Sequence, residues 1–168
     1  IADVLASIAF HYGRTTPNGI RMDPASGLIW SPSHFTWMDT NHPAGTPREG
    51  YPVEIQALWI RLLRQLDRLG VPTPGEPWGD LAARAERSLL DLFWLEEQGW
   101  LVDVLIARAG QPAREAAPQD ALRSNCLLAV TCGQLAGERA RRCVEAALRH
   151  LVVPGALRSL APLPVSPP

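Results

Sequence analysis

Apolar residues recur every three or four positions in five parts of the chain. This period is typical of helices that bury one face. Gly13 follows the first apolar stripe, and Pro52 and Gly70 flank the second. Proline suits the first turn of a helix, and glycine suits the position after its last turn. The pattern predicts helices over residues 1–12, 55–66, 80–98, 120–135 and 140–151, the last closed by Pro154.

The segments between these helices are predicted to be loops. Residues 14–51 form a loop too long to be a simple connection, and its aromatic content argues against disorder. Strand signals are confined to residues 101–107. The predicted fold class is therefore all-α, with about five helices and one long aromatic-rich loop. We expect one domain over residues 1–162, followed by a Pro-rich tail at 163–168.

Composition limits the partners that the chain can have. The 168 residues carry a formal net charge of −1, which provides no basic surface for nucleic acid. No apolar run approaches the roughly 20 residues of a membrane span, and no leader pattern opens the sequence. We therefore expect a cytoplasmic protein that binds neither nucleic acid nor membranes. Cys126, Cys132 and Cys143 have no metal-ligand spacing and are interpreted as small core residues on helices.

Residues 28–59 combine aromatic and charged side chains with prolines, in the order LIWSPSHFTWMDTNHPAGTPREGYPVEIQALW. Proteins bind sugars with aromatic rings that stack on their C–H faces and with charged groups that bind their hydroxyls. This stretch supplies both kinds of group. The candidate rings are Trp30, Trp37 and Tyr51, and the candidate polar partners are Asp39, Arg48, Glu49 and Glu54.

The carboxylates of this stretch also raise the question of catalysis. Hydrolysis of a glycosidic bond needs two carboxyl groups that flank it, and the spacing of Asp39, Glu49 and Glu54 assigns no roles. Glu54 also has a structural interpretation. It lies in the first turn of a predicted helix, where a carboxylate interacts favourably with the helix dipole. Arg48 and Glu49 can equally form a solvated ion pair. Asp39 lies two residues after Trp37 in a non-helical segment. Of the three carboxylates, it is the one least easily explained by a purely structural role.

Other residues of the stretch favour structural roles. Trp59 lies on the apolar stripe of residues 55–66 and is predicted to be core. His34 and His42 have no further ligand at metal spacing, so we expect them to orient the loop backbone. Neither Ser31 nor Ser33 has the Gly-flanked elbow of a serine nucleophile, and no Gly-rich phosphate loop occurs. We therefore expect neither a metal nor a cofactor.

Two runs in this stretch carry a resemblance to a known family. TWMD at 36–39 and TPREGYPVEIQALW at 46–59 resemble the glucosidase domain of glycogen debranching enzymes, of the bacterial and archaeal amylo-alpha-1,6-glucosidase type. DALRSNCLLAV at 120–130 and GALRSLAP at 155–162 resemble further segments of the family in the same order. The resemblance runs over residues 2–162.

The resemblance implies a fold and an activity. The family removes alpha-1,6-linked glucose from glycogen or limit dextrin by inverting hydrolysis, in a pocket at one end of a six-hairpin (α/α) toroid. The inner helices of a toroid face a partly polar centre, which suits Asn125 on the apolar stripe of residues 120–135. The candidate catalytic residues are Asp39 and Glu54, and the candidate substrate contacts are Trp30, His34, Trp37, Arg48, Glu49 and Asn125.

A full toroid has about twelve helices, so the resemblance implies a fragment that is inactive alone. We expect an alpha-glucan partner, and self-association or a complementing chain at the open edge of the toroid. Two other classes remain open. One is a non-catalytic glycan-binding helical module, expected if only one carboxylate faces the pocket. The other is a helical interaction protein, for which Trp30 and Trp37 are expected on a convex surface.

Overall fold

The computed structural model describes residues 1–38, 48–73 and 75–164. Helices make up 45% and strands 16% of these residues, so the fold is mixed α/β and the predicted all-α class is wrong. Each strand is only two or three residues long. A strand of this length is too short for the alternation of apolar and polar residues to show in the sequence.

The helices account for most of the predicted apolar stripes. They are α1 (Ala2–Gly13), α2 (Val53–Arg68), α3 (Trp78–Phe93), α4 (Leu127–Thr131) and α5 (Gly137–His150), with short 3₁₀ turns η1 (Ala113–Glu115) and η2 (Ser124–Cys126). The stripes over residues 1–12, 55–66 and 140–151 fall within or nearly within α1, α2 and α5, which confirms those three predictions.

Two predicted helices end early or begin late. The helix expected over 80–98 stops at Phe93, because Trp94 is extended and opens a hairpin. The helix expected over 120–135 is reduced to η2 and α4. The chain before η2 is extended, and Gly133, at φ +80°, lies in the left-handed region just after α4. The sequence shows a helical apolar period over residues 120–135, although the buried side chains lie on two different local structures, η2 and α4.

Nine short strands form four small antiparallel sheets within the described part of the chain. Eight of the strands are β1 (Arg21–Met22), β2 (Ile29–Trp30), β4 (Trp94–Leu95), β5 (Trp100–Leu101), β6 (Val104–Ile106), β7 (Ala117–Gln119), β8 (Val152–Val153) and β9 (Ala156–Leu157); the ninth is β3 (Gly50–Pro52). The largest sheet has the order β3-β6-β7, in which Tyr51 faces Leu105 and Leu105 faces Pro118. Proline is tolerated at Pro118 because β7 is an edge strand.

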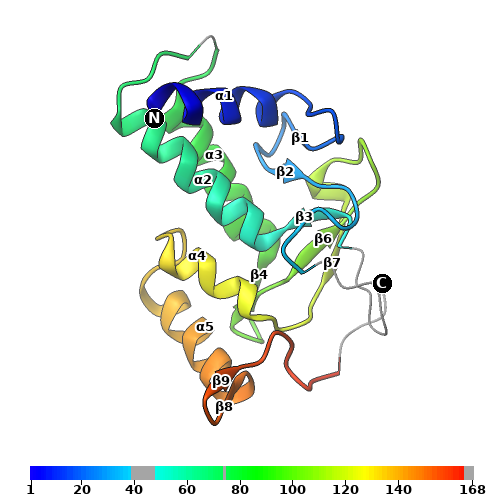
Figure 1. The fold of residues 1–168 in the computed structure, drawn as a ribbon. Helices are drawn as coiled ribbons and strands as arrows, with labels where there is room; N and C mark the ends of the chain where they lie inside the picture. The colour runs from blue at the N-terminus through cyan, green and yellow to red at the C-terminus, as the bar shows by residue number, and fades with distance from the viewer. Residues whose placement is uncertain (39–47, 74, 165–168) are drawn as a thin grey trace.

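The core lies along α2 and α3, which pack side by side (Figure 1). Leu63, Leu66 and Leu89 are fully buried between them and their neighbours. Trp59 is buried too and donates its indole N–H to the carbonyl of Gly27 at 2.9 Å, which confirms it as a core residue. The β3-β6-β7 sheet lies at the end of the pair where α2 begins (Figure 1). No described helix combines the length and the apolar character that a membrane crossing requires.

Two residues hold β2 and β3 against their neighbours. The Gln56 side chain donates to the carbonyl of Ile29 at 2.8 Å and accepts from its N–H at 2.7 Å. It therefore pairs with the backbone of β2 as a neighbouring strand would. Gly50 has φ +134°, and a Cβ at this position would lie 2.0 Å from the carbonyl oxygen of Leu105. Only glycine therefore allows β3 to approach β6 at this point.

Candidate functional site

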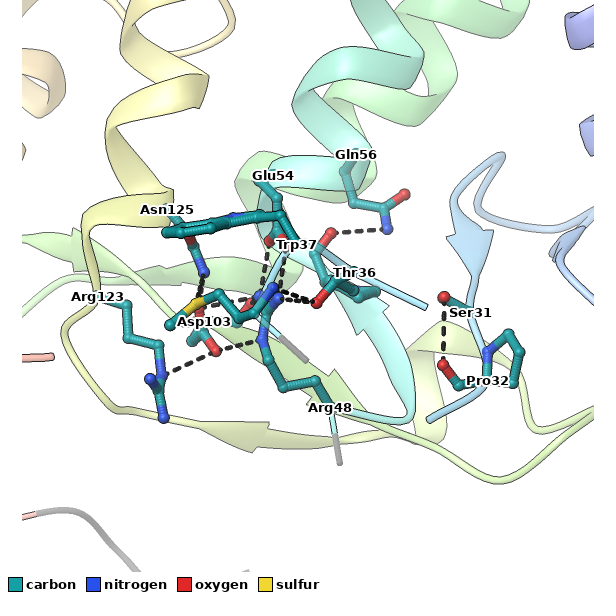
Figure 2. A network of polar contacts seen from close by, with 12 residues as sticks. Ser31, Pro32, Thr36, Trp37, Arg48, Glu54, Gln56, Asp103, Arg123 and Asn125 are labelled. Atoms are coloured by element: carbon teal, nitrogen blue, oxygen red, sulfur yellow. Dashed lines mark hydrogen bonds and ion pairs between the residues drawn. The ribbon is translucent and has the colours of Figure 1, made fainter. Parts of the chain in front are cut away.

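A buried polar cluster lies where the end of the long loop, the start of α2, the β5–β6 connection and η2 meet (Figure 2). Arg48 comes from the loop and Glu54 from the first turn of α2. Asp103 comes from the connection between β5 and β6, and Asn125 comes from η2. Four segments that are distant in the sequence thus contribute to one cluster.

Arg48 is the centre of the cluster and uses all three of its side-chain nitrogens. Its Nε and Nη2 donate to the two carboxylate oxygens of Asp103, at 2.8 and 3.1 Å. Its Nη1 and Nη2 donate to the two oxygens of Glu54, at 2.5 and 2.6 Å. Nη1 also donates to the Thr36 hydroxyl at 3.0 Å. The guanidinium therefore forms two bidentate pairs, the strongest geometry available to it.

The cluster is shielded from solvent. The side chains of Arg48 and Glu54 are each 1% exposed, and that of Asp103 is fully buried. Burial alone would lower the pKa of Arg48, but the hydrogen bonds and charges of Glu54 and Asp103 outweigh burial and raise it. Arg48 is therefore a permanent cation paired with two buried carboxylates, one of which also lies beside Arg123.

Asp103 is a candidate site residue that was not predicted from the sequence. Besides Arg48, its carboxylate accepts a hydrogen bond from the Asn125 amide at 2.8 Å and lies 3.2 Å from Nε of Arg123. Its own backbone carbonyl accepts from the N–H of Val53 at 2.9 Å, which ties it to the start of α2. The signal available in the sequence was one acidic residue in the otherwise apolar run LVDVLIA at 101–107. Arg123 lies in the segment DALRSNCLLAV at 120–130, which carries part of the family resemblance, but it was not among the predicted site residues.

Asn125 connects the buried cluster to an exposed aromatic ring. Its side-chain oxygen accepts a hydrogen bond from the Trp37 indole N–H at 3.2 Å, while its NH₂ contacts the Met38 sulfur at 3.0 Å. Trp37 is 65% exposed, although its indole nitrogen is held by Asn125. Figure 2 shows the two side chains next to each other above the Arg48 cluster. A ring held at its edge with an open surface is a suitable platform for the C–H face of a sugar.

The other two predicted aromatic surfaces are not available in this way. Trp30 is 5% exposed, and its indole N–H donates to the carbonyl of Ala107 at 2.9 Å. The guanidinium of Arg21 lies 4.9 Å from the Trp30 ring. Tyr51 is 2% exposed, and its hydroxyl donates to the carbonyl of Gln111 at 2.7 Å. Both rings therefore serve the packing of the loop against β6 and the turn that follows it.

The remaining predicted site residues have different surroundings. His34 is exposed and has φ +63°, a backbone conformation that non-glycine residues adopt rarely. Glu49 is half-buried, and one of its carboxylate oxygens lies 3.5 Å from the Ser33 hydroxyl. Glu54 belongs to the Arg48 cluster, as described above. Asp39 and His42 lie outside the described residues.

The described residues provide no metal centre. Within 1–38, 48–73 and 75–164, no three or more His, Cys, Asp and Glu side chains gather where they could hold a metal ion. What the arrangement offers is the exposed ring of Trp37, held at its edge beside the buried polar cluster. Such a ring is a means of recognising the C–H face of an uncharged polyol.

The family model described as amylo-alpha-1,6-glucosidase matches residues 1–165. The chain therefore belongs to the amylo-alpha-1,6-glucosidase family, a glycogen-debranching type of glycoside hydrolase domain. No curated protein matches the chain in a sequence comparison. The family assignment confirms the resemblance carried by residues 36–39 and 46–59.

Proposed function

We propose that this chain recognises the alpha-1,6-linked glucose of a branched alpha-glucan, as part of a glycoside hydrolase that releases this glucose by inverting hydrolysis. Membership of the amylo-alpha-1,6-glucosidase family supports the substrate class. The proposed position of the sugar site rests on a single observation, the hydrogen bond from the Trp37 indole to Asn125. It fixes an exposed ring beside a rigid polar cluster.

The roles of the side chains follow from their surroundings. Trp37 offers the stacking face, and Asn125 orients the ring while its NH₂ is held by Asp103. Arg48, with Glu54 and Asp103 on two sides, keeps the end of the loop in place. We assign these buried groups to positioning, because their hydrogen-bonding atoms are already engaged by one another.

Catalysis is proposed for carboxylates other than the two paired with Arg48. An inverting glycosidase holds its acid and base about 6.5–9.5 Å apart, with room for a water molecule between base and sugar. Glu54 is a poor candidate for either role because Arg48 engages both of its oxygens. Asp39, next to the segment of Trp37 in the sequence, remains the proposed catalytic candidate, and Glu49 remains a proposed sugar contact.

Isothermal titration with panose, which carries an alpha-1,6-linked glucose, tests the proposal, with maltotriose as the unbranched comparison. We expect panose to bind more tightly, and Trp37→Ala to abolish the heat. Trp94→Ala is the matched control, because Trp94 is bonded instead to Glu96 and lies near Arg139 and Arg142. Equal panose binding by the unmodified chain and by Trp37→Ala would overturn the assignment.

A specific observation also favours a second function, glycan binding without catalysis. Both carboxylates of the described cluster are buried and paired with Arg48, so their oxygens are already engaged within the protein. An assay for glucose released from limit dextrin distinguishes the two functions. Release that depends on Asp39 supports the hydrolase, and panose binding without any release supports the binding module.

Self-association or a complementing chain is part of the proposal. The side chains of Ile1, Val4 and Ile8 on or next to α1 are 98%, 62% and 39% exposed. Sedimentation velocity at increasing protein concentration checks it. A sedimentation coefficient that does not change with concentration contradicts self-association.

A further inference from the structure

Two buried thiols lie next to each other, one of them directly after Asn125 in η2. The sulfurs of Cys126 and Cys143 are 3.6 Å apart, and neither forms a disulfide. Cys126 is 1% exposed and Cys143 is fully buried. Cys126 is the last residue of η2 and Cys143 lies in α5, so the pair connects two elements of the fold. The buried positions agree with their interpretation as small core residues, but the contact between the two sulfurs goes beyond that interpretation.

Cys126 is also directly attached to the candidate sugar site. It follows Asn125, whose side chain holds both the Trp37 indole and the Asp103 carboxylate. The Cys126 thiol donates to the carbonyl of Arg123 at 3.1 Å. Any movement of the Cys126 sulfur toward α5 therefore acts on the same short turn that orients Trp37.

We propose that Cys126 and Cys143 form a reversible disulfide when the chain meets a peroxide, and that this bond weakens the hold of Asn125 on Trp37. A disulfide has sulfurs about 2.05 Å apart, so the pair must close by about 1.5 Å. Closure draws η2 toward α5 and lengthens the contact between Asn125 and the indole. The consequence for sugar binding rests on the proposed function, whereas the disulfide itself does not.

The chemistry balances with hydrogen peroxide as the oxidant. The thiolate of one cysteine attacks a peroxide oxygen, the O–O bond breaks, and a sulfenic acid and hydroxide form. The second sulfur then attacks the sulfenic sulfur, so that the S–S bond forms and water leaves. Overall two thiols lose two electrons and two protons, and one peroxide becomes two waters. The hydrogen bond between the sulfurs lowers the pKa of Cys143, which favours Cys143 as the first nucleophile.

Cys132 provides a control within the same molecule. It is half-buried, and its sulfur lies 3.9 Å from a guanidinium nitrogen of Arg61, not from another sulfur. In the Cys132→Ser chain the remaining thiols are Cys126 and Cys143 alone. Peroxide oxidation of this variant, followed by alkylation and intact-mass measurement, should show a loss of about 2 Da and no alkylated thiol, as formation of one disulfide requires.

Peptide mapping of the unmodified chain identifies the bond. The sequence has no lysine, so trypsin cuts after arginine and yields the peptides 124–139 and 143–149. We expect these two peptides to be joined, with Cys132 alkylated in the first. A bond to Cys132, a disulfide between two chains, or two thiols that stay free after oxidation would overturn the proposal. Reductant should restore both thiols.

A second readout tests the connection to Trp37 without any sugar. Emission is compared between the Cys132→Ser chain and its Trp37→Phe derivative, each in reduced and oxidised form. The Trp37 contribution should change on oxidation, and an unchanged contribution refutes the coupling. Panose should then bind about two- to tenfold more weakly to the oxidised chain, as expected for the loss of one hydrogen bond. If panose binds neither form, the proposed function fails while the mass and emission results still decide the redox proposal.

Discussion

Arg48 and Asp103, 55 positions apart in the sequence, meet side on, with two parallel N–H···O bonds of 2.8 and 3.1 Å. The same guanidinium also meets Glu54 in a second bidentate pair. One side chain thus joins the loop, the first turn of α2 and the β5–β6 connection. Because the contact is buried, its loss leaves charges that water cannot reach.

Replacing Arg48 by methionine should therefore destabilise the protein by about 3–5 kcal/mol, since buried Glu54 loses its paired guanidinium and buried Asp103 keeps only Arg123. Urea unfolding followed by tryptophan emission measures this loss. Arg84→Met is the matched control, because the Arg84–Glu76 pair is partly exposed, with side chains 24% and 38% accessible. The control should change the free energy of unfolding by less than about 1 kcal/mol. Similar losses in both variants would contradict the role given to Arg48.

The Glu54→Gln variant separates a structural from a catalytic role. If Glu54 serves Arg48, the amide keeps the shape and loses the charge, and the free energy of unfolding should fall by about 1–3 kcal/mol. Glu86→Gln is the control, because its partner Arg64 is 32% exposed. A Glu54→Gln chain with unchanged stability and unchanged panose affinity, but with glucose release abolished, would point to catalysis instead.

Gly50→Ala should be among the most damaging single changes in the described chain. The new methyl group would lie 2.0 Å from the carbonyl oxygen of Leu105, at a backbone φ of +134°. We expect a loss of more than about 3 kcal/mol, because β3 must leave β6. Gly70→Ala also has a positive φ, +62°, but open space around the new atom. It should cost about 1–2 kcal/mol, and a comparable cost at both positions would show that the β3–β6 contact is not critical.

The buried Tyr51 hydroxyl should make the free energy of unfolding depend on pH in the alkaline range. Burial raises the pKa of Tyr51 above its ordinary value, with the Asp23 carboxylate adding to the rise and Arg21 opposing it. The unfolded chain therefore loses this proton first, so the contribution of Tyr51 is complete below about pH 10 and falls as the pH rises further. Unfolding by urea at several pH values should show a smaller alkaline loss in Tyr51→Phe than in Tyr12→Phe. Parallel curves for the two variants would contradict this assignment.

The sequence carried enough information for the long elements. Apolar stripes such as Leu63 and Leu66 gave α2, and the odd run around Trp37 and Arg48 indicated where the polar site lies. These signals are local, since each depends on a few neighbouring residues. The prediction of Trp59 as core succeeded for the same reason, because its stripe is unambiguous.

What the sequence could not show are contacts between distant segments. Asp103 looked like one charge in an apolar strand, and only the fold brings it to Arg48 and Asn125. Trp30 was predicted as a sugar contact from its residue type, yet its partner Ala107 is 77 positions away. The strand signal at residues 101–107 did mark β6. The strands elsewhere were missed because two or three residues carry no measurable period, and the buried face of residues 120–135 was mistaken for one continuous helix.

The separation between Arg48, Asp103 and Asn125 also has a kinetic consequence. Contacts between distant parts of a chain form only after long loops have closed, and loop closure costs chain entropy. Such contacts therefore form late and slow the folding of small domains. The cluster can be complete only after α2, the β5–β6 connection and η2 have come together. Refolding should therefore restore helical circular dichroism before it restores the Trp37 signal. The surface around Trp37 would be the last part of the molecule to form, and a newly made chain would gain its helices before this surface.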